Sequence, residues 1–120
     1  ARRLLAGSAA GLALLRDAED DEIRSLVRRT AAEVPGFSAT AQEVLENVWL
    51  VRRTGHFLSR GMVTPGAGAL AMPLPPGLDR SGRPLALVLA GLIEELSRDE
   101  AVLAEAMAEA VERFIGGEGR

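Results

Sequence analysis

The chain has 120 residues, 48% of them hydrophobic, which is enough for one domain with one core and argues against disorder. The formal net charge of −3 gives no sign of a nucleic-acid-binding surface. Because the chain has no cysteine and one histidine, disulfides, thiolate chemistry and cysteine or histidine metal clusters are excluded. No apolar run approaches the roughly 18 residues of a membrane span.

Two helices are expected in the first third of the chain. Residues Ala6 to Leu15 are apolar on nearly every side, which predicts a short and mostly buried helix. The acids between Asp17 and Asp21 are N-cap candidates for a second helix that runs to about Ala32. Apolar residues at helical spacing give this second helix an inner face made of Ile23, Leu26, Val27 and Ala31.

A third helix is bounded by clear start and stop signals. Thr40 and Glu43 have the spacing of a capping box, in which each side chain satisfies a free backbone amide. The helix continues to Thr54, and Gly55 follows as a left-handed C-cap. Trp49 lies near the apolar stripe, where packing at the margin of the core explains it better than a cofactor role.

Extended segments follow the third helix. A short one covers His56 to Ser59, and a loop broken by glycine and proline covers Arg60 to Gly68. The strand Ala69 to Leu74 and the segment Leu85 to Val88, with its extension to Leu92, are apolar at consecutive positions, which predicts burial on both faces. The connection from Pro75 to Arg83 is expected to be a surface hairpin loop.

The last helix is expected to begin at a second capping box, Ser97 with Glu100, and to end at Gly116 and Gly117. Its expected buried side is made of Val102, Leu103, Ala106, Ala110, Val111 and Phe114. Three helices, three strands and a fourth helix in this order predict an α+β fold with an antiparallel sheet.

The patterns typical of chemistry are absent, so no catalytic residue, metal or cofactor is predicted. His56 would be the base of any triad, but no orienting carboxylate lies near it in the sequence. The acids from Asp20 to Glu22 lack the alternating spacing of a calcium loop. The segment Gly66 to Gly68 precedes a strand, whereas phosphate loops precede a helix.

Two stretches carry a family resemblance. From Val51 to Pro73 the chain reads VRRTGHFLSRGMVTPGAGALAMP, and Ala9 to Leu15 follow a small-small-Gly-Lys-Ala-aliphatic pattern with Leu12 at the lysine position. The pattern is an arginine before a Gly-aromatic pair, then a serine, glycines and an apolar strand that ends in proline. In these features the chain resembles the effector-binding domain of IclR-type transcription regulators. His56, Met62 and Met72 depart from the family's aromatic, acidic and alanine residues at those positions.

The resemblance implies a GAF-like α+β fold, with about three antiparallel strands packed with four helices. Residues 1–120 would be a single domain, the second half of an effector domain, without the family's N-terminal winged helix-turn-helix and first strands. It also implies a cytoplasmic homo-oligomer, dimer or tetramer, with no membrane contact, that reaches DNA only through the missing domain.

The resemblance further implies a binding site for a small-molecule effector. The matching positions are Ala9, Ala10, Ser59, Ala67, Ala69, Leu89 and Gly91. Only Ser59 among them has a polar side chain, so an apolar or aromatic effector with one polar end fits better than a bare carboxylate. Two alternatives to a ligand-sensing domain stay open: a structural association domain without a ligand, and a small α+β enzyme, which the missing catalytic set disfavours.

Overall fold

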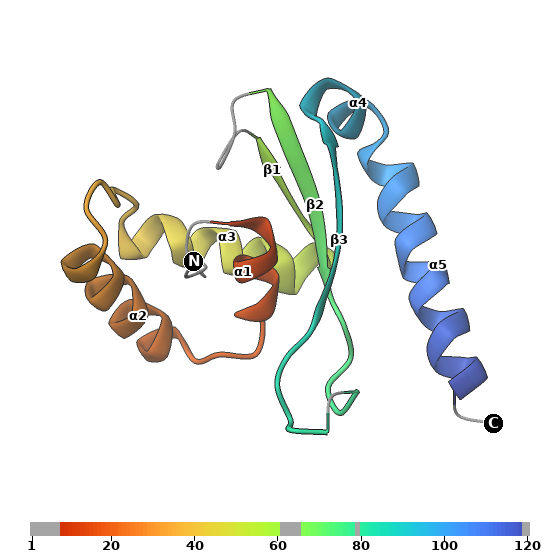
Figure 1. Ribbon diagram of the computed structural model, residues 1–120, viewed down its shortest axis with the longest axis horizontal. Helices are drawn as coiled ribbons and strands as arrows, with labels where there is room; N and C mark the ends of the chain where they lie inside the picture. The colour runs from red at the N-terminus through yellow and green to blue at the C-terminus, as the bar shows by residue number, and fades with distance from the viewer. Residues whose placement is uncertain (1–7, 61–65, 79, 119–120) are drawn as a thin grey trace.

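The computed structural model describes residues 8–60, 66–78 and 80–118, and within them the chain forms five helices and three strands (Figure 1). The elements in chain order are α1 (Ala9–Leu14), α2 (Asp20–Glu33), α3 (Ala41–Thr54), β1 (Phe57–Arg60), β2 (Ala67–Pro73), β3 (Ala86–Leu92), α4 (Ile93–Arg98) and α5 (Glu100–Glu118). The α+β class is as predicted, although a fifth helix, α4, joins the four that were expected.

The three strands form one antiparallel sheet in the order β1-β2-β3. Side chains alternate between the two faces of a sheet, and residues directly opposite each other share a face. One face carries Phe57, Ala71 and Val88, and is called the α1 face because α1 and α3 cover it, with α2 packed on α3. The other carries Leu58, Leu70 and Leu89, and is called the α5 face because α4 and α5 lie on it (Figure 1).

The larger of two apolar clusters fills the space between the α1 face and the first three helices. Its fully buried side chains include Leu12 of α1, Ile23 of α2 and Leu45 of α3. On α2 the inner face differs from the prediction, because Thr30 is buried and Ala31 is exposed. The Thr30 hydroxyl donates to the carbonyl of Leu26, so its burial leaves no unsatisfied polar group.

The predicted boundaries of α3 are confirmed. The Thr40 hydroxyl accepts from the amide of Glu43 at 3.1 Å, and the Glu43 carboxylate accepts from the amide of Thr40 at 2.8 Å. Gly55 has φ of +89°, the left-handed conformation that a C-cap glycine adopts without steric cost. The chain therefore leaves α3 in the direction of β1, which positions His56 and Phe57 at the edge of the sheet.

The smaller cluster packs α4 and α5 on the α5 face. Leu58 and Leu70 contact Leu96 of α4, together with Ala104 and Met107 of α5. The close approach of α4 requires a glycine at position 68: a Cβ there would lie 2.8 Å from a methyl group of Ile93 and 3.0 Å from the carbonyl oxygen of Ser59.

Three predictions about the last third of the chain are wrong. Ser97 does not cap α5 but lies inside α4, and the first helical bond of α5 runs from the Leu103 amide to the Asp99 carbonyl. Gly116 and Gly117 do not end α5, which continues to Glu118. Of the six residues expected on the buried side, Leu103 is partly buried against the smaller cluster, whereas Val102 and Phe114 are 70% and 60% exposed. The buried residues of α5 are instead Ala104 and Met107.

Strand β3 is also more exposed than its apolar sequence predicts. The described residues give it a partner strand on one side, β2, and its exposed large side chains are Leu87, Val88, Leu89 and Leu92. The expected burial on both faces holds for β2, the central strand, and is wrong for β3. No described helix combines the length and apolar character needed to cross a bilayer.

Candidate functional site

Three of the predicted site residues lie together on the α1 face. Ser59 is opposite Ala69 in the sheet, and Ala67 lies two residues before Ala69 on the same strand, so all three side chains share that face with Phe57. Helix α1 packs over β2 and β3 on this face, with Ala9 buried. The structure thus brings Ser59, Ala67 and Ala69 to the same side of the sheet as α1.

Leu89 and Gly91 are not part of this group. The register places Leu89 opposite Leu70 and Gly91 opposite Gly68, so both positions belong to the α5 face. A Cβ built on Gly91 would lie 3.8 Å from the side chain of Leu96. The sequence-based set took these two positions from the family resemblance, and residues one position apart on a strand lie on opposite faces.

The residue of β3 that completes the α1-face group is Ala90, because it is directly opposite Ala69. Ser59, Ala69 and Ala90 therefore form one row across the three strands. We call these three residues the cross-strand row. Ser59 is buried, whereas Ala90 is exposed, so the row runs from the interior toward open surface.

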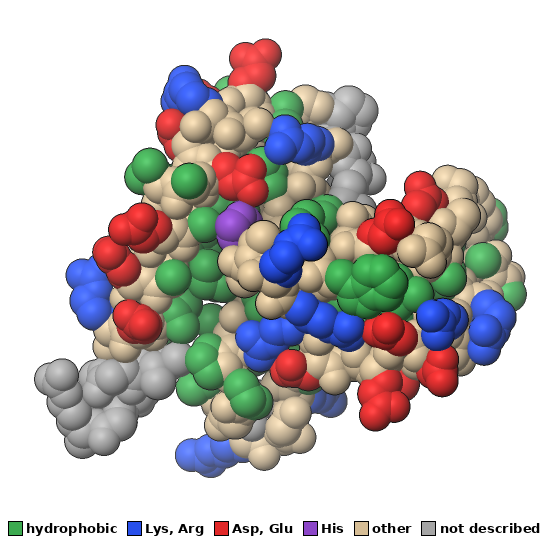
Figure 2. Space-filling view, turned by 180° about the vertical axis from the view of Figure 1, so that it is seen from behind, with side chains coloured by type: hydrophobic (Ala, Val, Ile, Leu, Met, Phe, Trp, Pro, Cys, Tyr) green, Lys and Arg blue, Asp and Glu red, His purple; other side chains and the backbone are tan. Residues whose placement is uncertain are grey.

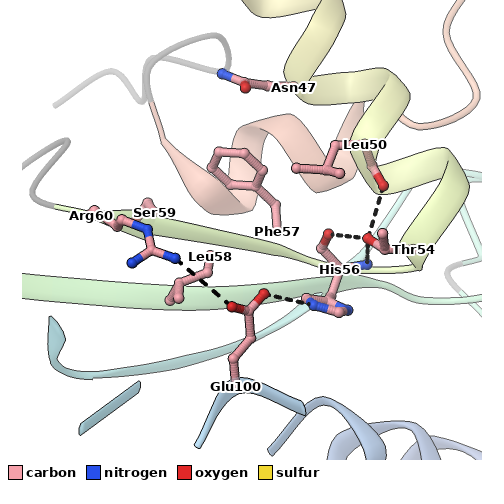
Figure 3. Close-up of a pocket in the computed structure, with 9 residues that line it drawn as sticks. All are labelled: Asn47, Leu50, Thr54, His56, Phe57, Leu58, Ser59, Arg60 and Glu100. Atoms are coloured by element: carbon pink, nitrogen blue, oxygen red, sulfur yellow. Dashed lines mark hydrogen bonds and ion pairs between the residues drawn. The ribbon is translucent and has the colours of Figure 1, made fainter. Parts of the chain in front are cut away.

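A hollow that shares Ser59 with the cross-strand row lies at the β1 edge of the sheet, and Figure 3 shows it in close-up. This cavity of about 430 Å³, called the β1-edge pocket, is lined by Asn47, Leu50, Thr54, His56, Phe57, Leu58, Ser59, Arg60 and Glu100. Phe57 points toward α3 and lies beside Leu50, while Leu58 points in the opposite direction, toward α5 (Figure 3). The pocket therefore extends past both faces of the sheet at this edge.

A polar cluster borders the pocket on its α5 side. The Glu100 carboxylate lies between two side chains of β1 and its flank: Oε2 is 3.0 Å from Nε2 of His56, and Oε1 is 3.9 Å from a guanidinium nitrogen of Arg60 (Figure 3). Arg60 also donates to the Ser97 hydroxyl at 2.9 Å. Figure 2 shows the histidine at the molecular surface. No sequence pattern predicts this cluster, because 44 residues separate His56 from Glu100.

The backbone of His56 is fixed as well as its ring. The single proton of the Thr54 hydroxyl is within hydrogen-bond distance of two carbonyls, that of His56 at 2.9 Å and that of Leu50 at 2.8 Å, and the hydroxyl oxygen lies 3.4 Å from the His56 amide. Three of the residues that line the pocket are therefore joined where α3 ends and β1 begins.

Arg52, the arginine of the family pattern, has a structural role. It donates to the carbonyls of Arg16 and Ala18 and pairs with Asp20 at 3.1 Å, so it ties the α1–α2 connection to α3. The hydrogen bond from Arg52 lowers the pKa of the Asp20 carboxyl below its usual value. Trp49 lies 3.5 Å from the same carboxylate, which places it at the margin of the core, as expected.

The part of the chain that the structure describes contains no group of three or more metal-ligating side chains. No protein-family model and no curated protein matches the sequence. Solved structures do match, and those that follow are all transcription regulators.

The effector domain of a protein described as the transcriptional regulator IclR of Acinetobacter sp. ADP1 matches with a TM-score of 0.81 and 23% identity, over 94% of this chain and 66% of that one. An IclR-family protein described as a transcriptional regulator from Rhodococcus sp. has a TM-score of 0.64 and 27% identity, over 92% and 42%. An IclR homologue from Microbacterium hydrocarbonoxydans, solved with 4-hydroxybenzoate, has a TM-score of 0.61 and 19% identity, over 78% and 38%.

The chain therefore has the fold of the effector domain of IclR-type regulators, as the sequence resemblance implied. It spans 66% of the length of the Acinetobacter effector domain and less than half of the other two chains. The structures that it resembles are regulators and not enzymes.

Proposed function

We propose that this chain is the ligand-sensing part of an IclR-like transcription regulator. The observation that carries the proposal is the agreement between the fold and the placement of Ser59, Ala67 and Ala69, which lie together under α1. A regulator of this kind responds to a ligand that binds one conformation more tightly than another. Contact with DNA would then belong to a different domain, since this chain is acidic and shows no basic reading helix.

The chemistry of the α1 face favours an apolar or aromatic effector with one polar end. Ala67 and the cross-strand row supply small apolar side chains apart from Ser59, so a bare carboxylate would lose hydration there with few donors in return. An aromatic ring is bound by apolar contact, which the small side chains allow. One hydroxyl or carboxyl group of the ligand can form hydrogen bonds with Ser59 or with the backbone amides of Ala9 and Ala10. The Microbacterium homologue, solved with 4-hydroxybenzoate, supports this class of ligand.

A screen by thermal unfolding tests the proposal. The panel contains 4-hydroxybenzoate, related phenols and aromatic acids, and the small oxo-acids glyoxylate and pyruvate. A ligand present at about 100 times its Kd adds roughly 2.7 kcal/mol of stability, which raises the Tm by several degrees. We expect at least one aromatic compound to do so, and the two oxo-acids to have no effect. Stabilisation by the oxo-acids alone would contradict the proposed ligand class.

Two matched variants locate the site. Ala90→Phe adds a ring to the cross-strand row, and Leu89→Phe changes the adjacent residue, which faces the other way. Both positions are exposed, so neither substitution overfills a buried space. The Tm increase caused by the aromatic ligand should be lost in Ala90→Phe and kept in Leu89→Phe. A structural association domain without a ligand predicts no Tm increase in any of the three proteins.

A further inference from the structure

The β1-edge pocket holds two positively chargeable side chains around an internal carboxylate. His56 and Arg60 are four residues apart on an extended segment, so their side chains lie on the same side of the strand with Leu58 between them (Figure 3). One Glu100 oxygen faces each of them, at 3.0 Å and 3.9 Å. A ligand carboxylate bound between a histidine and an arginine would have the same arrangement. Here the carboxylate is that of Glu100, the first residue of α5.

The remainder of the pocket is suited to the apolar part of a small molecule. Leu50, Phe57 and Leu58 provide apolar surface, and Asn47 and Thr54 border it with polar groups. A volume of about 430 Å³ lies within the range of roughly 300–1,000 Å³ that is usual for small-molecule sites. The pocket lies beside the larger apolar cluster, at the outer strand β1 of the three-stranded sheet.

We propose that the β1-edge pocket binds a small carboxylic acid with an aromatic or other apolar body, and that the ligand's carboxylate displaces Glu100 from His56 and Arg60. Two carboxylates beside one guanidinium repel each other, so the ligand and Glu100 exclude one another. Glu100 can leave because its side chain is 34% exposed, so water can hydrate its carboxylate once the ligand takes its place beside His56.

Displacement has a consequence for α5. Glu100 is the first residue of α5, and its contacts with His56 and Arg60 tie the start of that helix to β1. A bound acid would remove both contacts, leaving the apolar packing of Ala104 and Met107 to hold the helix on the sheet. Occupation of the β1-edge pocket would thereby be communicated to the C-terminal helix.

Calorimetry with naphthalene-2-carboxylate tests the proposal, and naphthalene-2-carboxamide is the uncharged control ligand. The acid should bind the wild-type chain and the amide should bind at least about tenfold more weakly, since a charged hydrogen bond is lost. Glu100→Gln removes the internal competitor and should tighten binding of the acid roughly two- to fivefold. Arg60→Gln should weaken it roughly tenfold, whereas Arg53→Gln, an exposed arginine at the end of α3, should leave it unchanged.

Equal affinity for the acid and the amide would overturn the proposal, as would weaker binding to Glu100→Gln in a variant whose Tm shows that it is folded. Two-dimensional NMR of the wild-type chain supplies a second readout, in which the amides of Leu58, Glu100 and Ala101 should shift on binding. Ala90→Phe separates this site from the proposed effector site: acid binding at the β1-edge pocket should survive that substitution. Loss of acid binding in Ala90→Phe would assign the acid to the cross-strand row and contradict the second site.

Discussion

Single residues whose surroundings come from distant parts of the chain decide how this fold is assembled. Gly68 gives α4 its close contact with β2, and Arg52 joins the α1–α2 connection to α3. Each contact can be tested by a substitution, with the same substitution at a nearby residue of the same type, which lacks the contact, as the control.

Gly68→Ala should destabilise the fold by about 1–3 kcal/mol, as other overpacked sites do. The Ile93 side chain can turn away from the new methyl group, but the Ser59 carbonyl, 3.0 Å away, belongs to a paired strand and cannot. Gly91→Ala is the matched control, since its Cβ would meet Leu96 at an ordinary 3.8 Å. For this control, the free energy of unfolding measured in urea should stay within about 0.5 kcal/mol of the wild-type value. Equal losses in the two variants would show that close contact with α4 is not the cause.

Asp20→Asn should lower the Tm at neutral pH and have a vanishing effect in acid. The hydrogen bond from Arg52 makes the pKa of Asp20 lower in the folded than in the unfolded chain. Its contribution to stability is therefore complete above the unfolded pKa and is lost as the pH falls through the folded pKa. Tm values of the wild type and the variant, measured from neutral pH to acid, should converge. Asp21→Asn is the control in the same turn, and a difference that persists below the folded pKa of Asp20 would contradict this assignment.

At the scale of secondary structure, the local start and stop signals are correct for α3 and wrong for α5. The capping box at Thr40 and the C-cap at Gly55 are interactions within a few residues, so the sequence contains them completely. The Ser97 pattern failed because a neighbouring helix, α4, uses Ser97 in its interior. Which apolar residues of α5 are buried depends on the angle at which α5 crosses the sheet, and the sequence period does not determine that angle.

The candidate site was predictable to the same extent. The family resemblance supplied Ser59, Ala67 and Ala69, and the pairing of β1 with β2 puts all three on one face. Leu89 and Gly91 came from the same resemblance, but the pairing of β2 with β3 across a long hairpin puts them on the other face, and no local pattern determines that pairing to one residue. Glu100 was missed because its partner His56 is 44 residues away.

Thr40→Ala should cost about 1 kcal/mol of stability, the typical value of an N-cap side chain. The Thr40 hydroxyl satisfies the Glu43 amide at the start of α3, and alanine leaves that amide without the partner. Gln42→Ala is the control in the same turn, because it removes only an exposed contact with Glu46 that is worth a few tenths of a kcal/mol. The free energy of unfolding, measured by chemical denaturation, should therefore be lower for Thr40→Ala than for Gln42→Ala. A Thr40→Ala variant as stable as the wild type would count against the capping box.

At the scale of the whole molecule, the two ends of the sheet differ in character. The β1 edge carries the pocket and its polar cluster, whereas β3 presents four exposed large apolar side chains. Apolar surface on an open strand edge recruits partners. The exposed apolar side chains of β3 are therefore expected to serve association.

The isolated chain should accordingly associate into dimers or larger oligomers. Multi-angle light scattering of the 12.7 kDa chain should show at least twice that mass at high concentration. Val88→Lys places a charge on the exposed part of β3 and should shift the distribution toward monomer, because a charged edge resists pairing. Arg53→Lys keeps the charge on a distant helix and should have no effect. A monomeric wild-type chain at all concentrations would contradict the expectation.

The central claim is that this domain senses a small, largely apolar molecule at the α1 face of its sheet. The most direct test is an NMR titration of the isotopically labelled chain with the aromatic ligand that the thermal screen selects. The account predicts saturable shifts of the Ala69 and Ala90 amides and of the α1 amides at Ala9 and Ala10, with much smaller shifts in α2. Shifts confined to α5 and the β1 edge, or no saturable shift with any aromatic compound of the panel, would contradict it.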